Sequence, residues 1–559
     1  MKGLDFGTST TLVAESTAMR SAVTPIGSAD KWLPSLVARD HVRWAAGEDA
    51  LQYPEEQIIR SAKRAITRRA ESFVVFDGER EVELPADEVI VEILRKLVTV
   101  AEHEYVGLSD AAEVRLGCPA MWEGDQRRRL VRLAKEAGIS VEENSVVDEP
   151  IAAGVAWVNR QLARNIAVRG KVLVFDMGGG TLDVAVLTID ASPGDDELET
   201  SVSVQSAVGV DSAGDTLDEA IERDFESKLA ELGFDVASHA KRLELKGWIQ
   251  RAAREAKIDL STAHDTHVVF NHPSINIPAF DYTRLELETA FTGQLDGAVE
   301  TVFWALRSAL MAQVKSHSQR TSMRPSQARK LSKEDLANGV QFVVLAGGMA
   351  HIPMVRERMA TIFGADRVWV GVDETSTLSG TDSTEMIALG LAHHGTYDRM
   401  NLHRPGFDFV LEWHSPDTSE RQEQVVYEAY SPLYSFTDAI QTDQTKYNWS
   451  PSAGALPRKG EGLLKVRSVA GNFLGFRYRG QEIEGLRFRF GDGTPTVTLE
   501  PNGRVFWRDG AGYQESVRVA RWPVIRGFGQ ESLIIEEISE AVETKWTLKN
   551  LPWHMKPYD

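Results

Sequence analysis

The spacing of apolar positions divides the chain into two regions of different character. Up to about residue 395, strand-like runs alternate with helix-like stretches, as in EVRLGCPA (113–120) followed by GDQRRRLVRLAKEAG (124–138). This alternation predicts an α/β fold. From about residue 425, short alternating runs such as GLLKVRSV, TVTLE and RVFW are separated by Gly, Asn and Pro. They predict a β-rich domain, with a hairpin in which residues 501–503 connect TVTLE to RVFW.

The stretch between these regions, residues 396–424, is mostly polar. It is interrupted by an apolar patch made of Phe407, Phe409, Val410, Leu411 and Trp413. We therefore expect a domain over residues 1–395, a linker over 396–424 that docks through this patch, and a β-rich domain over 425–559.

One hairpin pattern occurs twice in the first region. GLDFGTSTTLVAES (3–16) and VFDMGGGTLDVAVL (174–187) both run from a strand into Asp, one further residue and Gly, then through small and hydroxyl residues into a second strand. Two hairpins of one design indicate two similar lobes that face a common ligand.

The glycines at these hairpin tips favour an anionic ligand. Without a Cβ the backbone can approach closely, and its N–H groups then form a concavity that suits phosphate. The residues expected to contribute are Gly7, Gly178, Gly179 and Gly180 through their backbone, and Thr8, Ser9 and Thr181 through their hydroxyl groups.

The aspartates of the two hairpins require a cation beside the phosphate. A carboxylate about 6 Å from a phosphate charge costs on the order of 3 kcal/mol at an effective dielectric constant near 20. Mg²⁺ prefers few carboxylates together with phosphate and water, so Asp5 and Asp176 are the expected magnesium partners, through water or directly, with Asp183 as a further candidate. Two tight turns with solvated acids remain the alternative.

A third glycine signal lies in FVVLAGGMAHIP (342–353). A buried strand ends at Gly347 and Gly348, and Pro353 suits the first turn of the helix that follows. A strand, a glycine pair and a helix N-terminus are typical of phosphate or nucleotide contacts, although an ordinary turn has the same pattern. The chain contains no GxxxxGK[ST] motif, which argues against a P-loop.

The composition of the chain limits the kinds of molecule that it is expected to bind. The 559 residues are 42% hydrophobic and carry a formal net charge of -20, which argues against general binding to nucleic acid or anionic membranes. No run of eighteen apolar residues and no signal-like start occur, and the single Cys118, expected to pack in the core, cannot form an internal disulfide. We expect a soluble, cytoplasmic protein.

Arg alternates with aromatic residues at 476–479 and 486–490. This alternation is typical of strands with one buried and one solvated face; a face that binds nucleic acid is the alternative.

These segments together resemble the ATPase domain of the seventy-kilodalton heat-shock (DnaK-type) chaperones, within the actin and hexokinase superfamily. GLDFGTSTTLVA is similar to the first phosphate motif of the family, VFDMGGGTLDVAVL to the second, and VVLAGGMAHIP to the adenosine motif. The resemblance covers about residues 1–395. It implies an α/β, two-lobed, actin-like ATPase with a duplicated ribonuclease-H-like fold that binds ATP or ADP with Mg²⁺.

The resemblance also implies roles for residues that composition and spacing leave unassigned. IIRSAKRAITRRA places the catalytic lysine at Lys63, and VVDEPIAAGVAW places a catalytic glutamate at Glu149. GCPAMWEGDQRRRL places a proline and an arginine of interdomain coupling at Pro119 and Arg127. Without the resemblance, Lys63 reads as a solvated helix charge and Glu149 as a cap or surface acid.

The expected nucleotide contacts include several departures from the family. Besides the hairpin residues and Gly347 and Gly348, the set holds Gly214, Asp215, Lys257, Ser261 and His351. Ile258 stands where the family has an arginine beside adenine, Arg254 where it has a ribose-binding glutamate, and His351 where it has a stacking arginine. Thr384 replaces a potassium-contacting aspartate. We expect ATP to bind more weakly than is usual in the family.

The implied function is that of an ATP-hydrolysing, chaperone-like protein that couples nucleotide state to a protein or peptide client, with co-chaperones as possible partners. Residues 425–559 resemble, less closely, a peptide-binding β-sandwich, and the chain after about residue 535 is too short for the helical lid of the family. Two alternatives share the same superfamily fold: a small-molecule kinase acting on a sugar-like acceptor, and an actin-like filament-forming ATPase.

Overall fold

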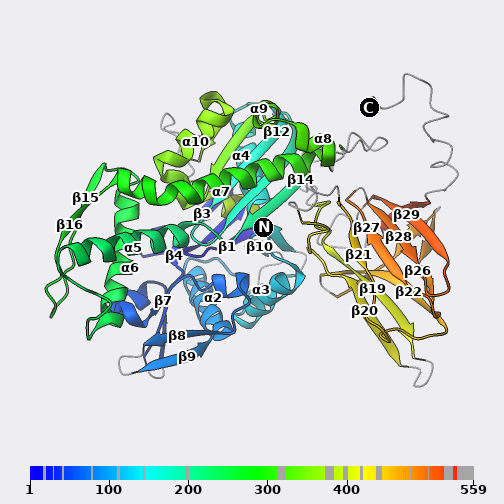
Figure 1. The fold of residues 1–559 in the computed structure, drawn as a ribbon, viewed down its shortest axis with the longest axis horizontal. Helices are drawn as coiled ribbons and strands as arrows, with labels where there is room; N and C mark the ends of the chain where they lie inside the picture. Colours follow the sequence, from blue (N-terminus) through cyan, green and yellow to red (C-terminus); the bar gives the residue numbers. More distant parts are fainter. Residues whose placement is uncertain are drawn as a thin grey trace. The chain divides into compact units, whose positions relative to one another are not determined.

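The computed structural model describes the chain in two compact units. The described residues are all except 17–20, 29, 41–42, 77–79, 110–113, 143–144, 195–200, 312–322, 324, 372–382, 394–400, 416–419, 436–443, 470, 479, 502, 522–532 and 538–559. The first unit comprises residues 1–310 and 329–399, and the second comprises residues 311–328 and 400–559. The first holds the helices coloured blue to green in Figure 1, and the second holds the later strands.

Two sheets with the same strand order form the centre of the first unit. The first sheet has the order β11-β10-β1-β2-β3, with β4 beside β2, and the second has the order β18-β17-β12-β13-β14. In each sheet the first three strands are parallel to one another, and the fourth and fifth strands each pair antiparallel with the strand before them. The strands are β1 (Lys2–Phe6), β2 (Thr10–Ser16), β3 (Ser21–Thr24), β4 (Leu33–Pro34), β10 (Val114–Cys118), β11 (Val146–Asp148), β12 (Val168–Met177), β13 (Leu182–Ala191), β14 (Ser201–Val210), β17 (Phe342–Ala346) and β18 (Val368–Val370).

Both hairpins predicted from the repeated pattern are confirmed. β1 pairs antiparallel with β2, and β12 pairs antiparallel with β13. Their tips, residues 7–9 and 178–181, join the strands without a break in the ladder. The apolar residues of β1 and β12 are buried up to the last residue of each strand, and the glycines of the tips follow directly after them.

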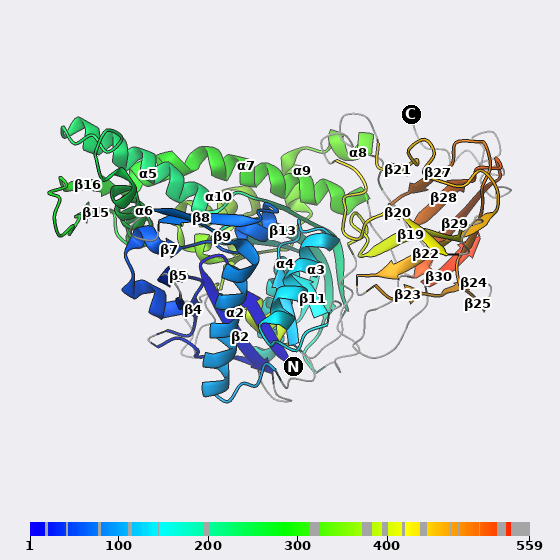
Figure 2. The same cartoon turned by 90° about the horizontal axis from the view of Figure 1, so that it is seen from below.

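Helices cover both sheets and connect them. α3 (Gly124–Glu136) lies between β10 and β11 in the sequence, and α10 (Pro353–Phe363) lies between β17 and β18, beginning at Pro353 as expected. α4 (Glu149–Ala163) follows the first sheet but packs on β12 and β13, whereas α11 (Met386–Leu391) follows the second sheet but packs on β1 and β2. Figure 2 shows α3 and α4 close to β11. The chain therefore crosses between the sheets at the segment that begins with Glu149.

The remaining elements of this unit surround the sheets. α2 (Ala86–His103) is amphipathic and buries apolar residues at helical spacing from Val89 to Ala101. The others are η1 (Gly47–Gln52), η2 (Glu55–Gln57), α1 (Arg64–Thr67), α5 (Gly214–Glu231), α6 (Arg242–Asp259), α7 (Arg284–Met311), α9 (Lys333–Asn338), η4 (Gly348–His351), η5 (Ala365–Arg367), β5 (Val37–Asp40), β6 (Arg43–Ala46), β7 (Ile58–Ile59), β8 (Ser72–Phe76), β9 (Glu81–Pro85), β15 (Asp265–Val268) and β16 (Phe280–Thr283). The short helix α8 (Pro325–Lys330) spans a boundary between the units, with residues 325–328 in the second.

The second unit consists of two sheets that enclose one apolar core. One sheet has the order β20-β19-β22-β23 with β26 beside β22, and the other has the order β21-β27-β28-β29-β30-β24-β25. Phe409 and Leu464 of the first sheet share a core with Val497 and Trp507 of the second. The strands are β19 (Phe407–His414), β20 (Arg421–Tyr427), β21 (Tyr447–Trp449), β22 (Glu461–Ser468), β23 (Phe473–Leu474), β24 (Phe476–Tyr478), β25 (Gln481–Ile483), β26 (Leu486–Arg489), β27 (Thr496–Leu499), β28 (Arg504–Arg508), β29 (Gln514–Arg521) and β30 (Leu533–Glu537).

The structure differs from the expected linker over residues 396–424. Residues 407–414 form β19, a strand paired on both sides, and β20 follows it. Phe407, Phe409 and Leu411 alternate along β19 and are buried in the core of the second unit. The apolar patch is thus a core strand, and the boundary between the units lies at residues 399 and 400. Residues 396–400 and 416–419 of the expected linker lie outside the described residues, as do residues 538–559 beyond the last strand.

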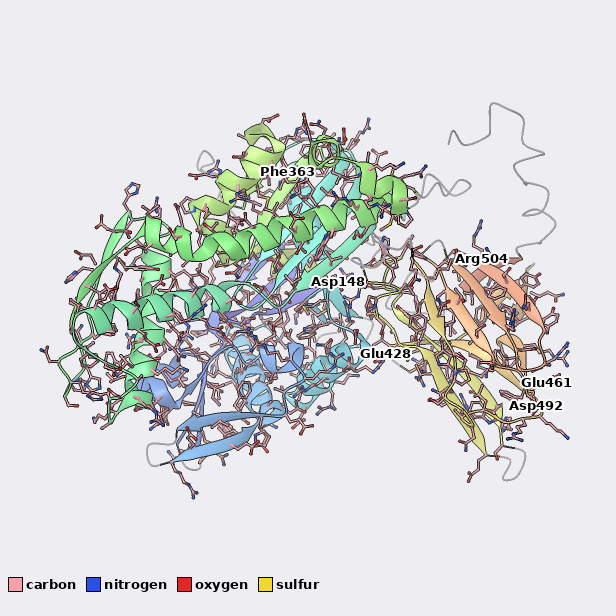
Figure 3. The ribbon with its side chains drawn as sticks, in the orientation of Figure 1. Asp148, Phe363, Glu428, Glu461, Asp492 and Arg504 are labelled. Atoms are coloured by element: carbon pink, nitrogen blue, oxygen red, sulfur yellow. The ribbon has the colours of Figure 1, made fainter. Side chains whose placement is uncertain are left out.

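The hairpin predicted around residues 501–503 is confirmed, because β27 pairs antiparallel with β28. The strands in which Arg alternates with aromatic residues have two faces, as expected. Phe476 and Phe488 are buried, while Arg477 pairs with Glu482, and Arg487 pairs with Glu461, which is labelled in Figure 3. Arg479 lies outside the described residues.

Candidate functional site

The tips of the two glycine hairpins meet at one cavity of about 420 Å³. A Cβ added to Gly179 would lie 2.5 Å from Oγ of Ser9, and one added to Gly180 would lie 2.7 Å from Oγ1 of Thr8. A larger residue at either position would therefore crowd a hydroxyl side chain of the other hairpin, and glycine lets the tips approach without that crowding. Most of the predicted site residues line this cavity: Asp5, Gly7, Thr8, Ser9, Lys63, Glu149, Asp176, Gly178, Gly179, Gly180, Thr181, Gly214, Lys257, Ser261, Gly347, Gly348 and His351.

The polar end of the cavity holds a buried cluster with more acids than bases. Lys63, which precedes α1, contacts Oε1 of Glu149, the first residue of α4, and both side chains are buried. Burial lowers the pKa of Lys63, but the charges of Glu149 and Asp5 outweigh it, so this pKa lies above its ordinary value. The Lys63 ammonium remains charged.

Three aspartates near Lys63 have raised pKa values. Burial, followed by the charge of Glu149, raises the pKa of Asp5 to about 7 and that of Asp183 to about 7. The same two causes raise the pKa of Asp176 well above its ordinary value. Oδ1 of Asp176 is buried and has no hydrogen-bond partner among the described residues. Four carboxylates face one ammonium here, which is the charge distribution of a site that accepts a cation.

The third glycine segment closes the cavity beside the second hairpin. Gly347 has a φ of 79°, and a Cβ there would collide with the carbonyl oxygen of Met177 and lie 2.7 Å from Oδ1 of Asp176. This backbone therefore reaches the end of β12 only because residue 347 is glycine. His351 follows in η4, and its Nε2 lies 3.0 Å from Oγ of Ser383.

The side of the cavity formed by α5 and α6 carries a paired set of charges. Nζ of Lys257 lies 2.6 Å from Oδ1 of Asp218 and donates to the carbonyl oxygen of Gly214 over 3.3 Å. Nε of Arg254 lies 3.7 Å from Oδ2 of the same Asp218. Ile258 lines the cavity with 65% of its surface exposed. Lys257 is thus held close to the second hairpin.

Four predicted residues do not line the cavity: Asp183, Asp215, Pro119 and Arg127. The backbone N–H of Asp215 donates to the carbonyl oxygen of Gly179 over 2.6 Å, but its carboxylate turns toward Arg64, whose Nη1 lies 3.1 Å away. Pro119 lies in the turn after β10 and accepts a hydrogen bond from the backbone of Trp122. Arg127, on α3, is buried with an exposed fraction of 1%. Cys118 is buried as expected, and burial raises its pKa.

Several residues around the cavity escaped the sequence reasoning. Arg64 and Arg68 follow Lys63 and form ion pairs with Asp211 and Asp215, which precede and begin α5. Leu12, Trp32, Met349, Ile352 and Ile387 give the cavity an apolar wall. Nothing in the sequence distinguishes these residues from ordinary surface charges or core positions, because their partners lie more than a hundred residues away or in other elements.

Two features are absent from the part of the chain that the structure describes. Among the described residues, no group of three or more His, Cys, Asp or Glu side chains is arranged to hold a metal ion. Within the same part of the chain, no helix has both the length and the apolar character needed to cross a bilayer. A cation at Asp5 and Asp176 would consequently need ligands from a bound anion and from water.

A comparison with models of protein families finds a match over the first 379 residues. The model described as Hsp70 protein matches residues 1–379, which include both glycine hairpins, Lys63, Glu149 and the segment at Gly347.

Proposed function

The chain belongs to the Hsp70 family, and from this premise we propose that it hydrolyses ATP and couples its nucleotide state to the binding of a protein or peptide. Membership makes it a chaperone-type, ATP-binding protein, and the members of this family are ATPases. The observation that carries the proposal is the single cavity at which two glycine hairpins, Lys63 and Glu149 converge. We further propose that the repeated strand order reflects two ribonuclease-H-like lobes of an actin-like fold.

The residues present fit a magnesium ion carried on the phosphates. Among the described residues, Asp176 has a buried carboxylate oxygen without a hydrogen-bond partner, and Asp5 lies in the same cluster beside Glu149 and Lys63. Asp5 and Asp176 would hold the ion, directly or through water, since Mg²⁺ keeps several water ligands. When bound, Mg²⁺ would neutralise charge on the phosphate oxygens.

The side chains and backbone of the protein would position the phosphates and the attacking water, and would form no covalent bond with either. In phosphoryl transfer the protein mainly aligns the attacking water with the γ-phosphate and stabilises charge. We assign the phosphates to the backbone N–H groups of Gly179 and Gly180 and to the hydroxyl groups of Thr8 and Thr181. The N–H of Gly178 donates to the carbonyl oxygen of Thr181 over 3.1 Å and closes the hairpin. We assign the orientation of the water to Lys63, with Glu149 holding the ammonium in place.

The second unit is the part of the chain that we propose binds the protein or peptide client. Its two sheets enclose one core, as in the β-sandwich that the sequence resembles from residue 425 onward. We propose that it binds a protein or peptide and that the turn at Pro119 takes part in the coupling.

The test is phosphate release from ATP by the full chain with Mg²⁺, with and without unfolded peptides. Lys63→Ala should lower turnover by about 100-fold or more, comparable to the loss of one preorganised electrostatic contact. Lys333→Ala, which removes a surface lysine paired with Glu300, is the matched control and should have no effect. Transfer of phosphate to an added sugar instead of water would favour the kinase, and growth of light scattering with ATP would favour the filament.

A further inference from the structure

Arginines face one another on the outer face of the seven-stranded sheet, the face that points away from the apolar core of the second unit. The register of β28 and β29 places Arg504, which is labelled in Figure 3, directly opposite Arg518. Arg508 lies on the same face of β28, four residues beyond Arg504, because side chains alternate along a strand. Like charges directly opposite each other are unfavourable in a sheet, so this arrangement costs stability unless an anion lies beside it.

The same face has an aromatic residue that the core does not use. Val505 and Trp507 belong to the apolar core of the second unit, so Phe506 between them points to the outer face. Phe506 is only partly buried, and it lies in register with Thr498 on one side and Ser516 on the other. Apolar surface and hydroxyl groups therefore lie next to the arginines.

Little negative charge compensates these arginines. On the outer face of β21, β27, β28 and β29, none of the described strand residues is Asp or Glu. Glu500 follows β27 but lies 2.8 Å from Nζ of Lys446, and β30 brings one acid, Glu536, into register with Arg518. Within the described part of the chain, the buried Nε of Arg518 has no hydrogen-bond partner. The face therefore has an excess of positive charge and a donor that lacks an acceptor.

The acidic character of the chain belongs almost entirely to the first unit. The second unit contains 22 Lys and Arg residues against 21 Asp and Glu residues, whereas the first contains 40 against 61. The repulsion that the formal net charge of -20 exerts on an anionic partner therefore originates in the first unit. The charge of the second unit itself does not oppose an acidic partner.

We propose that the outer face of β27, β28 and β29 binds an acidic peptide in an extended conformation. The inference rests on the proposed function and deepens it, because it names the kind of client that the second unit takes. A carboxylate suits the arginines, since it accepts two parallel hydrogen bonds from one guanidinium. Arg504 and Arg508 are four strand residues apart, about 13 Å, which is also the spacing of every fourth residue in an extended peptide.

A single-stranded nucleic acid fits this face less well than an acidic peptide does. Proteins that bind single strands stack successive bases on several aromatic rings. Among the described residues on the outer face of β27, β28 and β29, Phe506 is the one aromatic residue. Hydrogen bonds to carboxylates therefore account for the arrangement better than base stacking does.

The test is fluorescence anisotropy of labelled ligands with the full chain, without nucleotide. The ligands are a peptide that alternates Glu with Val, a peptide of equal length with Lys in place of Glu, and a single-stranded DNA. We expect the Glu peptide to bind most tightly, and Arg508→Gln and Arg518→Gln each to weaken its binding about tenfold, as for a hydrogen bond between charged groups. Arg487→Gln is the control, because Arg487 lies on the other sheet and pairs with Glu461; it should bind like the wild type.

Thermal midpoints show which variants are folded, and the exposed Arg508 provides a readable variant if Arg518→Gln does not fold. Equal affinity for the Glu and Lys peptides, or wild-type affinity in the folded variants, overturns the inference. Tighter binding of the DNA, lost in the same variants, also overturns it, because the ligand would then be a nucleic acid.

Phosphate release from ATP, with and without an unfolded apolar peptide, separates this inference from the proposed function. Normal release that the apolar peptide stimulates, together with no binding of the Glu peptide, would overturn the inference alone. A wild-type chain that releases no phosphate would instead overturn the proposed function.

Discussion

The backbone N–H of Ala120 donates to Oδ1 of Asp183 over 2.7 Å. This hydrogen bond joins the turn after β10 to the second strand of the second glycine hairpin, and it connects the two sheets. Asp183 is buried, lies opposite Asp176 in the ladder, and also accepts a hydrogen bond from the Thr181 side chain. The carboxyl of Asp183 is therefore placed between the cavity and the turn that contains Pro119.

Asp183 should make the stability of the free protein depend on pH. Because its pKa in the folded chain is about 7, well above the ordinary value of 3.8, its contribution to stability is fully present below pH ~4 and is lost as the pH rises through 7. The loss amounts to at most about 4 kcal/mol. Asp183→Asn, which keeps the acceptor for Ala120, should flatten the dependence by this amount in urea unfolding without nucleotide or Mg²⁺.

The control for that prediction is Asp190→Asn on the same strand, where the side chain is 74% exposed. It should leave the pH dependence unchanged. Equal slopes for the wild type and Asp183→Asn between pH 5 and 8 would contradict the placement of the Asp183 carboxyl.

Arg64 should slow the release of nucleotide. The side chain of Arg64, the first residue of α1, forms ion pairs with Asp211 and Asp215 near the start of α5. Its Cγ would lie 3.2 Å from a Cβ added to Gly180. Opening the cavity separates these elements and breaks a partly buried ion pair, so Arg64→Gln should speed the dissociation of ADP about tenfold in stopped flow.

Arg69→Gln is the matched control for Arg64, because Arg69 pairs with Glu123 and Asp125, which flank the start of α3. Its dissociation rate should equal that of the wild type. If both variants release ADP at the wild-type rate, the ion pairs at α5 do not hold the cavity closed.

Gly180→Ala should impair the site without unfolding the protein. Its Cβ would lie 2.7 Å from Oγ1 of Thr8, so either this hydroxyl must turn away from the cavity or the hairpin tips must separate. We expect a loss of about 1–3 kcal/mol in Mg·ATP affinity, the usual cost of overpacking. Gly293→Ala, on α7 with open space around the added Cβ, should bind normally; equal affinities for the two variants would contradict the contact between the tips.

Ile258 accounts for the weak nucleotide binding that we expect. It lines the cavity where the family has an arginine beside adenine, and an aliphatic side chain offers no cation–π contact. Ile258→Arg should strengthen ATP binding by about 0.5–1 kcal/mol in a competition titration. Leu285→Arg, at an exposed position at the start of α7, controls for the added charge. No gain with Ile258→Arg would place the base elsewhere in the cavity.

Local patterns predicted the parts of the structure that depend on local geometry. Both glycine hairpins, the start of α10 at Pro353 and the hairpin at β27 and β28 follow from residues close in sequence. The strand at residues 407–414 did not, because its alternation of apolar residues is short and only pairing with β22, some fifty residues later, distinguishes a core strand from a docking linker.

The burial of Arg127 shows the same limit at the site. In sequence it is one of three consecutive arginines on α3, and Arg128 and Arg129 are not fully buried. What selects Arg127 is the helical phase set by the capping box of Glu123 and Gln126, together with Asp148 on a strand that pairs elsewhere. Such selection requires the tertiary fold, and periodicity alone does not supply it.

The most direct test of the account is calorimetric titration of the full chain with ATP in the presence and absence of Mg²⁺. The converging hairpins and the surplus of buried carboxylates predict binding of one nucleotide per chain with Mg²⁺, and a marked weakening when Mg²⁺ is removed. No heat of binding with Mg·ATP, in a protein that is shown to be folded, would contradict the central claim that this cavity is a nucleotide site.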